Sequence, residues 1–191
     1  MSGGGETAYN IGRQQRLTCF YYATNVNSAK MEVNMRDKAI VFEAGEGKAL
    51  SARGSAMFFK ATRASTNGAF SFMERTLSPG GRKPPPHIHT NCEEAFYVLD
   101  GEIEFFLGDD TVIGRRGSFV HVPGGVSHTF GNAATAPARL LIIHAPAMDA
   151  YFEELQTLWS GLVPPSRENE IALMRRHGME PGSKEGGKPG M

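Results

Sequence analysis

Two histidines lie two positions apart in the segment that runs from Gly81 to Glu94. On an extended chain, side chains two positions apart point to the same face, so His87 and His89 would present both imidazoles on one side. A carboxylate from the pair Glu93-Glu94 can return to that face after a short bend, and His128 adds an imidazole from a separate segment. Three imidazoles and one carboxylate suit one divalent transition metal ion: iron, manganese, nickel, cobalt, copper or zinc. Calcium and magnesium prefer oxygen-rich sites and are poor candidates.

Glycines and a proline stand at set distances around these candidate ligands. A glycine lies six positions before His87, and Gly101 closes the first segment. In the second segment, residues 117–132, Pro123 and a following glycine precede His128. Such residues fix where strands turn and therefore which side chains converge. A single histidine is more often structural than a ligand, and this frame is what favours the metal site.

Both segments resemble the two sequence motifs of the cupin superfamily, G(x)5HxH(x)3,4E(x)6G and G(x)5PxG(x)2H(x)3N. The first reads G-RKPPP-HIH-TNCE-E-AFYVLD-G and the second reads G-SFVHV-P-G-G-VS-H-TFG-N, with every motif position filled. The resemblance implies an all-β fold, the cupin double-stranded β-helix or jelly-roll barrel. The motif's spacing to the closing glycine selects Glu94 over Glu93. The implied metal ligands are therefore His87, His89, Glu94 and His128.

Two kinds of residue at this site carry further expectations. Glu94 is the ligand that could also dissociate and act as a base, so we expect it to be catalytic. Phe96 and Phe130 follow Glu94 and His128 by two positions. On regular strands they would share the metal-facing side and bind substrate. Core packing explains both phenylalanines equally well.

The remaining candidates near the ligands are interpreted as structural. Cys92 lies between ligands, but a complete set of three histidines and one glutamate leaves its thiol unneeded. His144 ends an apolar run, where it could donate a hydrogen bond to a ligand, although a structural strand-end histidine is the interpretation we favour. Glu93 is expected to face solvent or to support a ligand. We assign no role to His121 and His177.

The elements that must position these residues are predicted to be short strands. Between residues 37 and 147, runs rich in β-branched and aromatic residues end at Gly, Asp-Asp, Asn or Pro, as in an antiparallel barrel. No long helix-periodic interval separates them, which disfavours a parallel sheet. The predicted strands are Ala39–Phe42, Ala56–Ala61, Ala69–Leu77, Ala95–Leu99, Glu102–Leu107, Phe119–Val122, His128–Phe130 and Ala138–Ile143.

A helical segment is expected at residues 148–180. Apolar residues from Tyr151 to Leu162 recur at helical spacing after a potential N-cap, Asp149. A second short helix is predicted from about Ser166 to His177, with Gly178 as its C-terminal cap. We expect residues 1–36 to form a loosely ordered extension and residues 181–191 to form a disordered tail.

Composition excludes several classes of partner. Lys plus Arg and Asp plus Glu both number 20, so there is no broad basic field for nucleic acid. The first residues lack the pattern of a secretory signal, and no stretch approaches transmembrane length. The two cysteines do not form a disulfide framework, which is typical of a reducing compartment. We therefore expect a cytoplasmic location and no membrane partner.

The layout of one barrel followed by the helical segment AYFEELQTL…PPS…LMRRHGMEP is similar to bacterial quercetin 2,3-dioxygenase-like cupins. This resemblance implies a metal-dependent dioxygenase whose small aromatic or enolic, flavonol-like substrate meets dioxygen at the metal ion. It also implies a homodimer, since such relatives are often dimers. One alternative is a non-redox isomerase, cyclase or lyase that uses the ion as a Lewis acid. A small-molecule-binding cupin without turnover is another.

Overall fold

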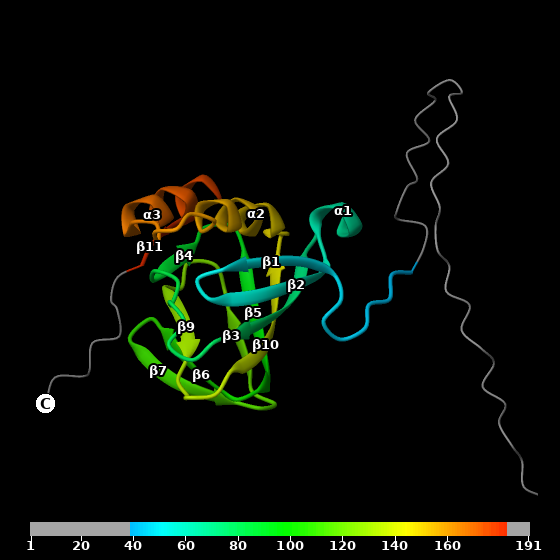
Figure 1. Ribbon diagram of the computed structural model, residues 1–191. Coiled ribbons are helices and arrows are strands. Elements are labelled where there is room, and N and C mark those ends of the chain that lie inside the picture. The colour runs from blue at the N-terminus through cyan, green and yellow to red at the C-terminus, as the bar shows by residue number, and fades with distance from the viewer. Residues whose placement is uncertain (1–38, 183–191) are drawn as a thin grey trace, which may run out of the picture. The chain divides into compact units, whose positions relative to one another are not determined.

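The computed structural model describes residues 39–182, which form two antiparallel sheets followed by two helices (Figure 1). Strand order is β1-β2-β3-β10-β5-β8 in the six-stranded sheet and β11-β4-β9-β6-β7 in the five-stranded sheet. This confirms the predicted all-β barrel with a C-terminal helical extension. The strands are β1 (Lys48–Ala52), β2 (Ser55–Ala61), β3 (Ser71–Leu77), β4 (His87–His89), β5 (Glu93–Asp100), β6 (Glu102–Leu107), β7 (Asp110–Arg115), β8 (Phe119–Val122), β9 (His128–Asn132), β10 (Ala138–Ala145) and β11 (Met179–Pro181). The helices are α1 (Arg63–Thr66), α2 (Asp149–Leu158) and α3 (Arg167–Arg176).

The barrel core follows from side chains that alternate along the strands. In β10, every second side chain from Ala138 to His144 is buried, and the intervening residues are more exposed. The opposing strand β3 alternates in the same way, with antiparallel pairing from Ala138 opposite Leu77 to His144 opposite Ser71. One face of each strand therefore fills the barrel interior. The most deeply buried core side chains include Met57, Phe59, Met73, Phe96, Phe105, Leu140 and Ile142.

The sequence pattern located seven of the eleven described strands and predicted one strand that the structure does not contain. The predicted strand Ala39–Phe42 is wrong, because this segment has no regular structure and its side chains are exposed. An apolar run predicts a strand only where a neighbouring strand can pair with it, and none of the described strands does so here. The pattern missed β1, β4, β7 and β11. The other predictions coincide with β2, β3, β5, β6, β8, β9 and β10.

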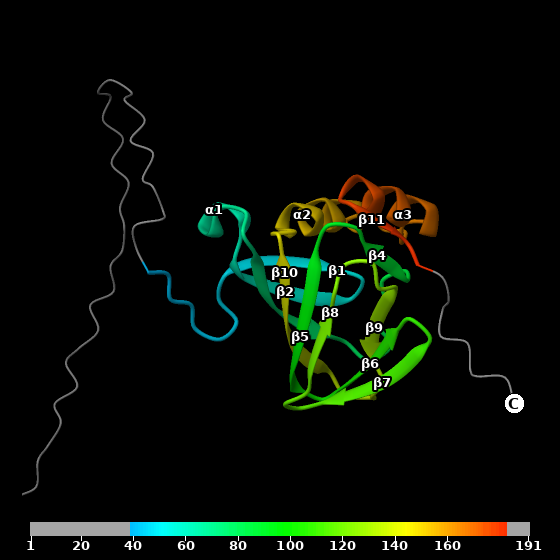
Figure 2. The ribbon, with the colours of Figure 1, turned by 180° about the vertical axis from the view of Figure 1, so that it is seen from behind.

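The two C-terminal helices lie side by side across one end of the barrel, close to the β1-β2 hairpin (Figures 1 and 2). Phe152 of α2 packs against Phe59 of β2, with ring centroids 5.5 Å apart. Asp149 is not the N-cap as predicted. It is the first residue of α2, and its carboxylate accepts a hydrogen bond from the backbone N–H of Arg63 at 2.8 Å. Helix α2 also ends before Leu162, which is fully exposed.

Helix α3 has the predicted ends. Its N-cap, Ser166, accepts a hydrogen bond from the backbone N–H of Asn169 at 3.2 Å, and Gly178 follows the helix at a φ of 74°. The chain then pairs as β11 with β4, placing Pro181 opposite His87. Pro181 therefore belongs to a strand and not to the predicted tail. The extension at residues 1–36 and residues 183–191 lie outside the described part of the chain.

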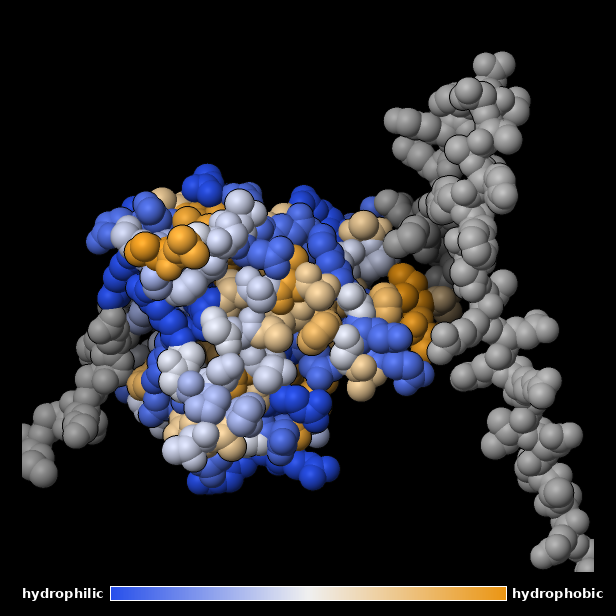
Figure 3. Space-filling model, viewed as in Figure 1, coloured by the Kyte–Doolittle hydropathy of each residue, from blue (hydrophilic) through white to orange (hydrophobic). Residues whose placement is uncertain are grey.

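Two groups of exposed apolar side chains stand out on the face of the molecule shown in Figure 3. One is the segment after residue 38, where Ile40, Val41 and Phe42 are exposed. The other is the connection between α2 and α3, with Leu162 and Val163. None of the helices in residues 39–182 has the length and apolar character needed to cross a membrane.

Candidate metal centre

The four predicted ligands come together from three strands inside the barrel. His87 and His89 lie on β4, Glu94 on β5 and His128 on β9, and His87 pairs with His128 in the sheet. One potential ligand atom from each residue lies within 4.8 Å of those of the other three, and all four side chains are buried. The HxH spacing works as expected, because β4 places both imidazoles on the inward face.

Backbone carbonyls set the orientation of two of the imidazoles. His87 Nδ1 lies 2.9 Å from the carbonyl oxygen of Pro85, and His128 Nδ1 lies 3.0 Å from that of Val126. A carbonyl oxygen can only accept, so each Nδ1 carries the hydrogen and donates it. Each Nε2 is therefore the atom available to a metal, as in most histidine-metal sites.

A single carboxylate oxygen lies at the centre of the cluster. Glu94 Oε2 is 2.8 Å from His128 Nε2 and 3.2 Å from His89 Nε2. Burial alone would raise the pKa of the Glu94 carboxyl, but the charge of His144 and hydrogen bonds from the surrounding imidazoles hold this pKa well below its usual range. Glu94 is therefore ionised, as a metal ligand must be.

The imidazoles differ in their affinity for protons. Burial and then the charges of His128 and His89 hold the pKa of His87 well below its usual range, so its ring is neutral. Burial would also lower the pKa of His128, but its hydrogen bond to Glu94 and the charge of that carboxylate raise it. A proton on His128 and a metal ion would thus compete for the same nitrogen.

The donor set fits one divalent transition metal ion. Ligand atoms about 2.1 Å from a common ion lie about 3 Å apart when adjacent and about 4.2 Å apart when opposite. The 4.8 Å limit observed here exceeds these spacings by a margin that side-chain rotation can close. Three nitrogens and one oxygen match iron, manganese, cobalt, nickel, copper or zinc. The cluster could therefore bind one such ion.

His144 is a neighbour of the cluster that the sequence interpretation undervalued. It lies opposite Glu94 in the pairing of β10 with β5, and its Nε2 is 3.0 Å from Glu94 Oε1. The favoured interpretation, a purely structural strand-end histidine, is corrected by this contact. A signal was available in the sequence, since His144 continues the inward positions Leu140 and Ile142 of β10.

The other residues discussed near the ligands lie away from the centre. The Cys92 thiol contacts the backbone oxygens of Glu93 and Pro146, and burial raises its pKa to about 12. Glu93 is exposed and pairs with His121 at 3.0 Å. His177 contacts Glu154 at 3.0 Å, on the surface of the helical segment.

The cluster faces a cavity of about 20 Å³. A cavity of this size holds about one water molecule. Phe130 belongs to its wall, whereas Phe96 packs against Phe105 and Phe130 with ring centroids 5.2 and 4.9 Å away. Substrate contact stays a prediction for both phenylalanines. The wall consists of Arg53, Arg75, Pro84, His87, His89, Glu94, Phe130, His144, Met148, Tyr151, Phe152, Met174 and Met179.

Two buried arginines in this wall were missed by the sequence analysis. Arg75 occupies an inward position of β3 between Met73 and Leu77, so the alternation of that strand could have revealed it. Arg53 lies in the turn between β1 and β2 and gives no comparable signal, because the direction of a turn side chain does not follow a strand period.

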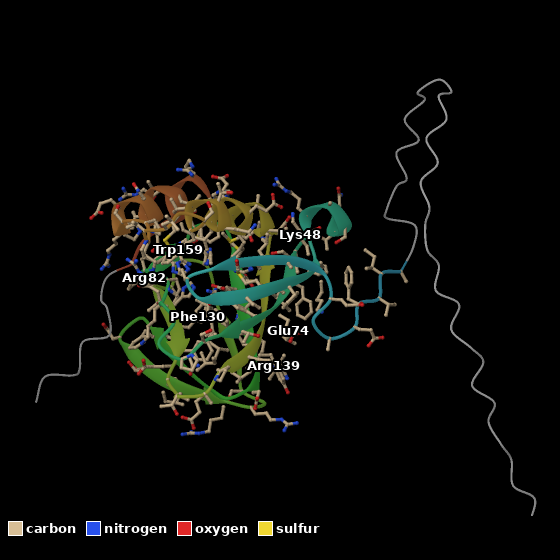
Figure 4. The ribbon with its side chains drawn as sticks, in the orientation of Figure 1. Lys48, Glu74, Arg82, Phe130, Arg139 and Trp159 are labelled. Carbon is tan, nitrogen blue, oxygen red and sulfur yellow. The ribbon has the colours of Figure 1, made fainter. Side chains whose placement is uncertain are left out.

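A second, larger hollow of about 320 Å³ shares Pro84 with this cavity as a lining residue. Arg82 stacks over the ring of Trp159, with the guanidinium carbon 5.4 Å from the centroid (Figure 4). Lys83 pairs with Glu104 at 2.6 Å. The hollow is lined by Arg82, Lys83, Pro84, Pro85, Pro86, Phe106, Thr129 and Arg167.

Comparison with known proteins agrees with this geometry. The cupin domain model matches residues 73–144, which include all four candidate ligands. An uncharacterized protein of Streptomyces coelicolor is 32% identical over 95 residues, covering 46% of this chain and 89% of that protein.

Two solved structures show the same fold. The polyketide cyclase RemF from Streptomyces resistomycificus matches with a TM-score of 0.50 at 23% identity, covering 56% of this chain and 80% of that chain. KdgF from Halomonas sp. matches with a TM-score of 0.52 at 16% identity, covering 59% of this chain and 98% of that chain.

Proposed function

We propose, from the premise that this chain belongs to the cupin superfamily, that it is a metal-dependent enzyme acting on a small molecule inside the barrel. The observation that carries the proposal is the buried cluster of His87, His89, Glu94 and His128, of which all but His128 line a small cavity. Backbone carbonyls orient two of the imidazoles before any ion binds. Such orientation is typical of sites built to hold a metal.

The chemistry proposed is that of a dioxygenase acting on a small enolic compound. When bound, a divalent transition metal ion supplies a positive centre that attracts an anionic oxygen and, for a redox-active ion, permits reaction with dioxygen. Both atoms of dioxygen enter the substrate, so the reaction needs no separate reductant. The bound ion and Glu94 together carry a net charge near plus one, which favours an enolate.

The chain's own residues would exclude water and handle a proton. Met148, Phe152 and Met174 form the apolar side of the cavity wall. Exclusion of water by apolar side chains strengthens the electrostatic interactions within the cavity. Glu94 is the proposed base, which would take a proton from the substrate. His144 donates to its second oxygen and would hold the carboxylate in place.

This Glu94–His144 contact also favours a second candidate, a non-redox isomerase, cyclase or lyase. A carboxylate and an imidazole 3.0 Å apart can move a proton without any change in the oxidation state of a metal. The metal would then act only as a Lewis acid.

Metal content tests the site directly. The protein should be purified without chelators and analysed for metals, in parallel with His89→Ala and with His121→Ala as the matched control. His121 is an exposed histidine that pairs with Glu93 and lies outside the cluster. We expect about one ion per chain in the wild type and the control, and almost none in His89→Ala. Full occupancy of His89→Ala would contradict the ligand assignment.

Oxygen uptake separates the two candidate reactions. Wild-type protein loaded with iron, manganese, nickel, cobalt or copper should consume dioxygen with at least one member of a panel of flavonols and 1,3-diketones. Zinc as the sole native metal, together with no uptake across the panel, would favour the non-redox candidate. Binding without conversion of any compound would instead indicate a binding protein.

A further inference from the structure

Two arginines are buried beside the candidate metal ligands, and their surroundings differ. Arg53 and Arg75 both line the cavity, and each is only 2% exposed. Arg53 donates from Nε to Glu170 at 3.0 Å and from a terminal nitrogen to the Tyr151 hydroxyl at 3.1 Å. Its charge is therefore balanced by a buried carboxylate.

Arg75 forms no direct ion pair among the described residues, and the carboxylate that attracts its charge is Glu94, a candidate metal ligand. A terminal nitrogen donates to the Ser55 hydroxyl at 3.2 Å, and the guanidinium lies over the Phe130 ring, 5.3 Å from its centroid. Its Nε is buried without a hydrogen-bond partner, and among the described residues no carboxylate forms an ion pair with Arg75. Burying a charge without a counter-ion is costly, so an anion is expected to bind such a group.

The charges around the cavity indicate how much negative charge a bound ligand must carry to neutralise the site. Arg53 and Arg75 together balance Glu94 and Glu170, which sums to zero. A bound divalent ion would therefore leave the region at plus two. A ligand that carries two negative charges, one facing the ion and one facing Arg75, would neutralise it.

We infer that Arg75 is a binding residue for the carboxylate of a small dianionic substrate, such as a short dicarboxylate or the enolate of a 2-oxo acid. This inference rests on the proposed function and names the substrate class of the same site. The cavity of about 20 Å³ has room for about one water molecule, so side chains of its wall must move to admit a ligand, and a short ligand requires the smallest movement. A planar guanidinium is also the group best suited to a carboxylate.

A binding role and a structural role for Arg75 predict different effects of its replacement on the stability of the protein. Replacing a buried, unpaired charge by an apolar side chain of similar length is often neutral or stabilising. Arg75→Met should therefore leave the metal-loaded, ligand-free protein at least as resistant to urea as the wild type. A packing or hydrogen-bonding role would instead make Arg75→Met less stable.

Malonate, a dianion, and malonamide, its neutral analogue of similar shape, are suitable probes. Their binding to zinc-loaded protein is measured by isothermal titration calorimetry, for the wild type, Arg75→Met and Arg75→Lys. The matched control is Arg139→Met, which removes an exposed arginine on β10 that pairs with Glu74 and does not line the cavity. Metal content is measured for every sample.

We expect malonate to bind the wild type and Arg139→Met equally, and malonamide to bind far more weakly. Malonate affinity should fall about 10- to 100-fold in Arg75→Met. Arg75→Lys should recover part of it, because the charge remains but the two-point geometry is lost. Equal malonate binding by Arg75→Met and wild type would overturn the inference, as would no binding of malonate to zinc-loaded wild type.

The two proposals fail in different ways. Wild-type protein that holds zinc but does not bind malonate leaves the metal proposal intact and refutes the role of Arg75. Protein that holds no metal refutes the proposed function, and malonate titration of that same protein still reports on Arg75.

Discussion

The buried contact between Arg53 and Glu170 gives a direct test of how the helices are held on the barrel. Both side chains are 1% exposed, and Arg53 Nε lies 3.0 Å from Glu170 Oε1. The Trp159 indole N–H donates to the same oxygen at 2.7 Å, and Arg53 also reaches Tyr151 on α2. One carboxylate of α3 thus joins the β1-β2 turn to the end of α2.

Removing this carboxylate should be costly. Glu170→Ala would leave the Arg53 guanidinium buried without a counter-ion and the Trp159 N–H without an acceptor. Breaking a buried ion pair from one side costs about 3 to 5 kcal/mol, out of about 5 to 15 kcal/mol for a typical domain. Glu170→Gln keeps an oxygen acceptor and removes only the charge, so we expect a loss of about 1.5 to 3 kcal/mol. The matched control, Glu102→Ala, breaks an exposed pair with Arg115 and should cost at most about 1 kcal/mol.

Urea unfolding at fixed pH and metal concentration measures these differences. The chain contains a single tryptophan, Trp159, whose fluorescence reports on the contact itself, while circular dichroism follows the barrel. In Glu170→Gln the fluorescence transition should occur at lower urea than the barrel transition, because the helices detach first. A loss in Glu170→Ala no larger than in Glu102→Ala would refute the reasoning.

Three further outcomes are expected. In a variant whose other cysteine is replaced by serine, the Cys92 thiol should react with iodoacetamide at pH 8 over a thousand-fold more slowly in folded than in unfolded protein. Burial raises the pKa of this thiol to about 12, which leaves about one thiolate in ten thousand at that pH. Equal reaction rates, measured by mass spectrometry, would contradict this prediction. Gly101→Ala should lower the free energy of unfolding by more than Gly108→Ala does, because both have a positive φ but only Gly101 would place a Cβ 2.8 Å from Ala138; urea titration compares them. Chelator treatment should lower the melting temperature of the wild type, with recovery on adding zinc, and should not change that of Glu94→Gln; a shift of the same size in both would show that the stabilising ion binds elsewhere.

The strands that sequence alone located are those whose own residues carry the signal. The predicted boundaries Glu102–Leu107 and Phe119–Val122 coincide with β6 and β8, where turn residues mark both ends. Strand β1 was missed because Lys48–Ala52 holds small and polar residues, and it is a strand only because β2 pairs with it. Strand β7 was missed because its first residue, Asp110, belongs to the turn signal that precedes it. Pairing with a neighbour is a tertiary property that local pattern does not encode.

The three candidate histidine ligands could be named from sequence because glycines and a proline determine where their strands turn, whereas the resemblance to the cupin motif selected Glu94 over Glu93. Arg75 and His144 could not be assigned with the same rules, since what they contact depends on which strands lie beside β3 and β10. The burial of Arg53 is even harder to predict from the sequence. Its backbone has a φ of 54° within a tight turn, and only the folded helices create the buried place for its side chain.

The choice between Glu93 and Glu94 has a structural cause that is absent from the local pattern. Residues 95–99 are apolar on both faces, so either glutamate could point inward, and a shift of one residue in pairing would exchange them. Strand β10 pairs Arg139 with Asp100 but pairs Leu140 with Val98, so β5 holds one extra residue at a bulge. From there the register runs without interruption to His144 opposite Glu94. The bulge absorbs the residue that would otherwise turn Glu94 outward, and it thereby sets both the candidate ligand and its hydrogen bond to His144.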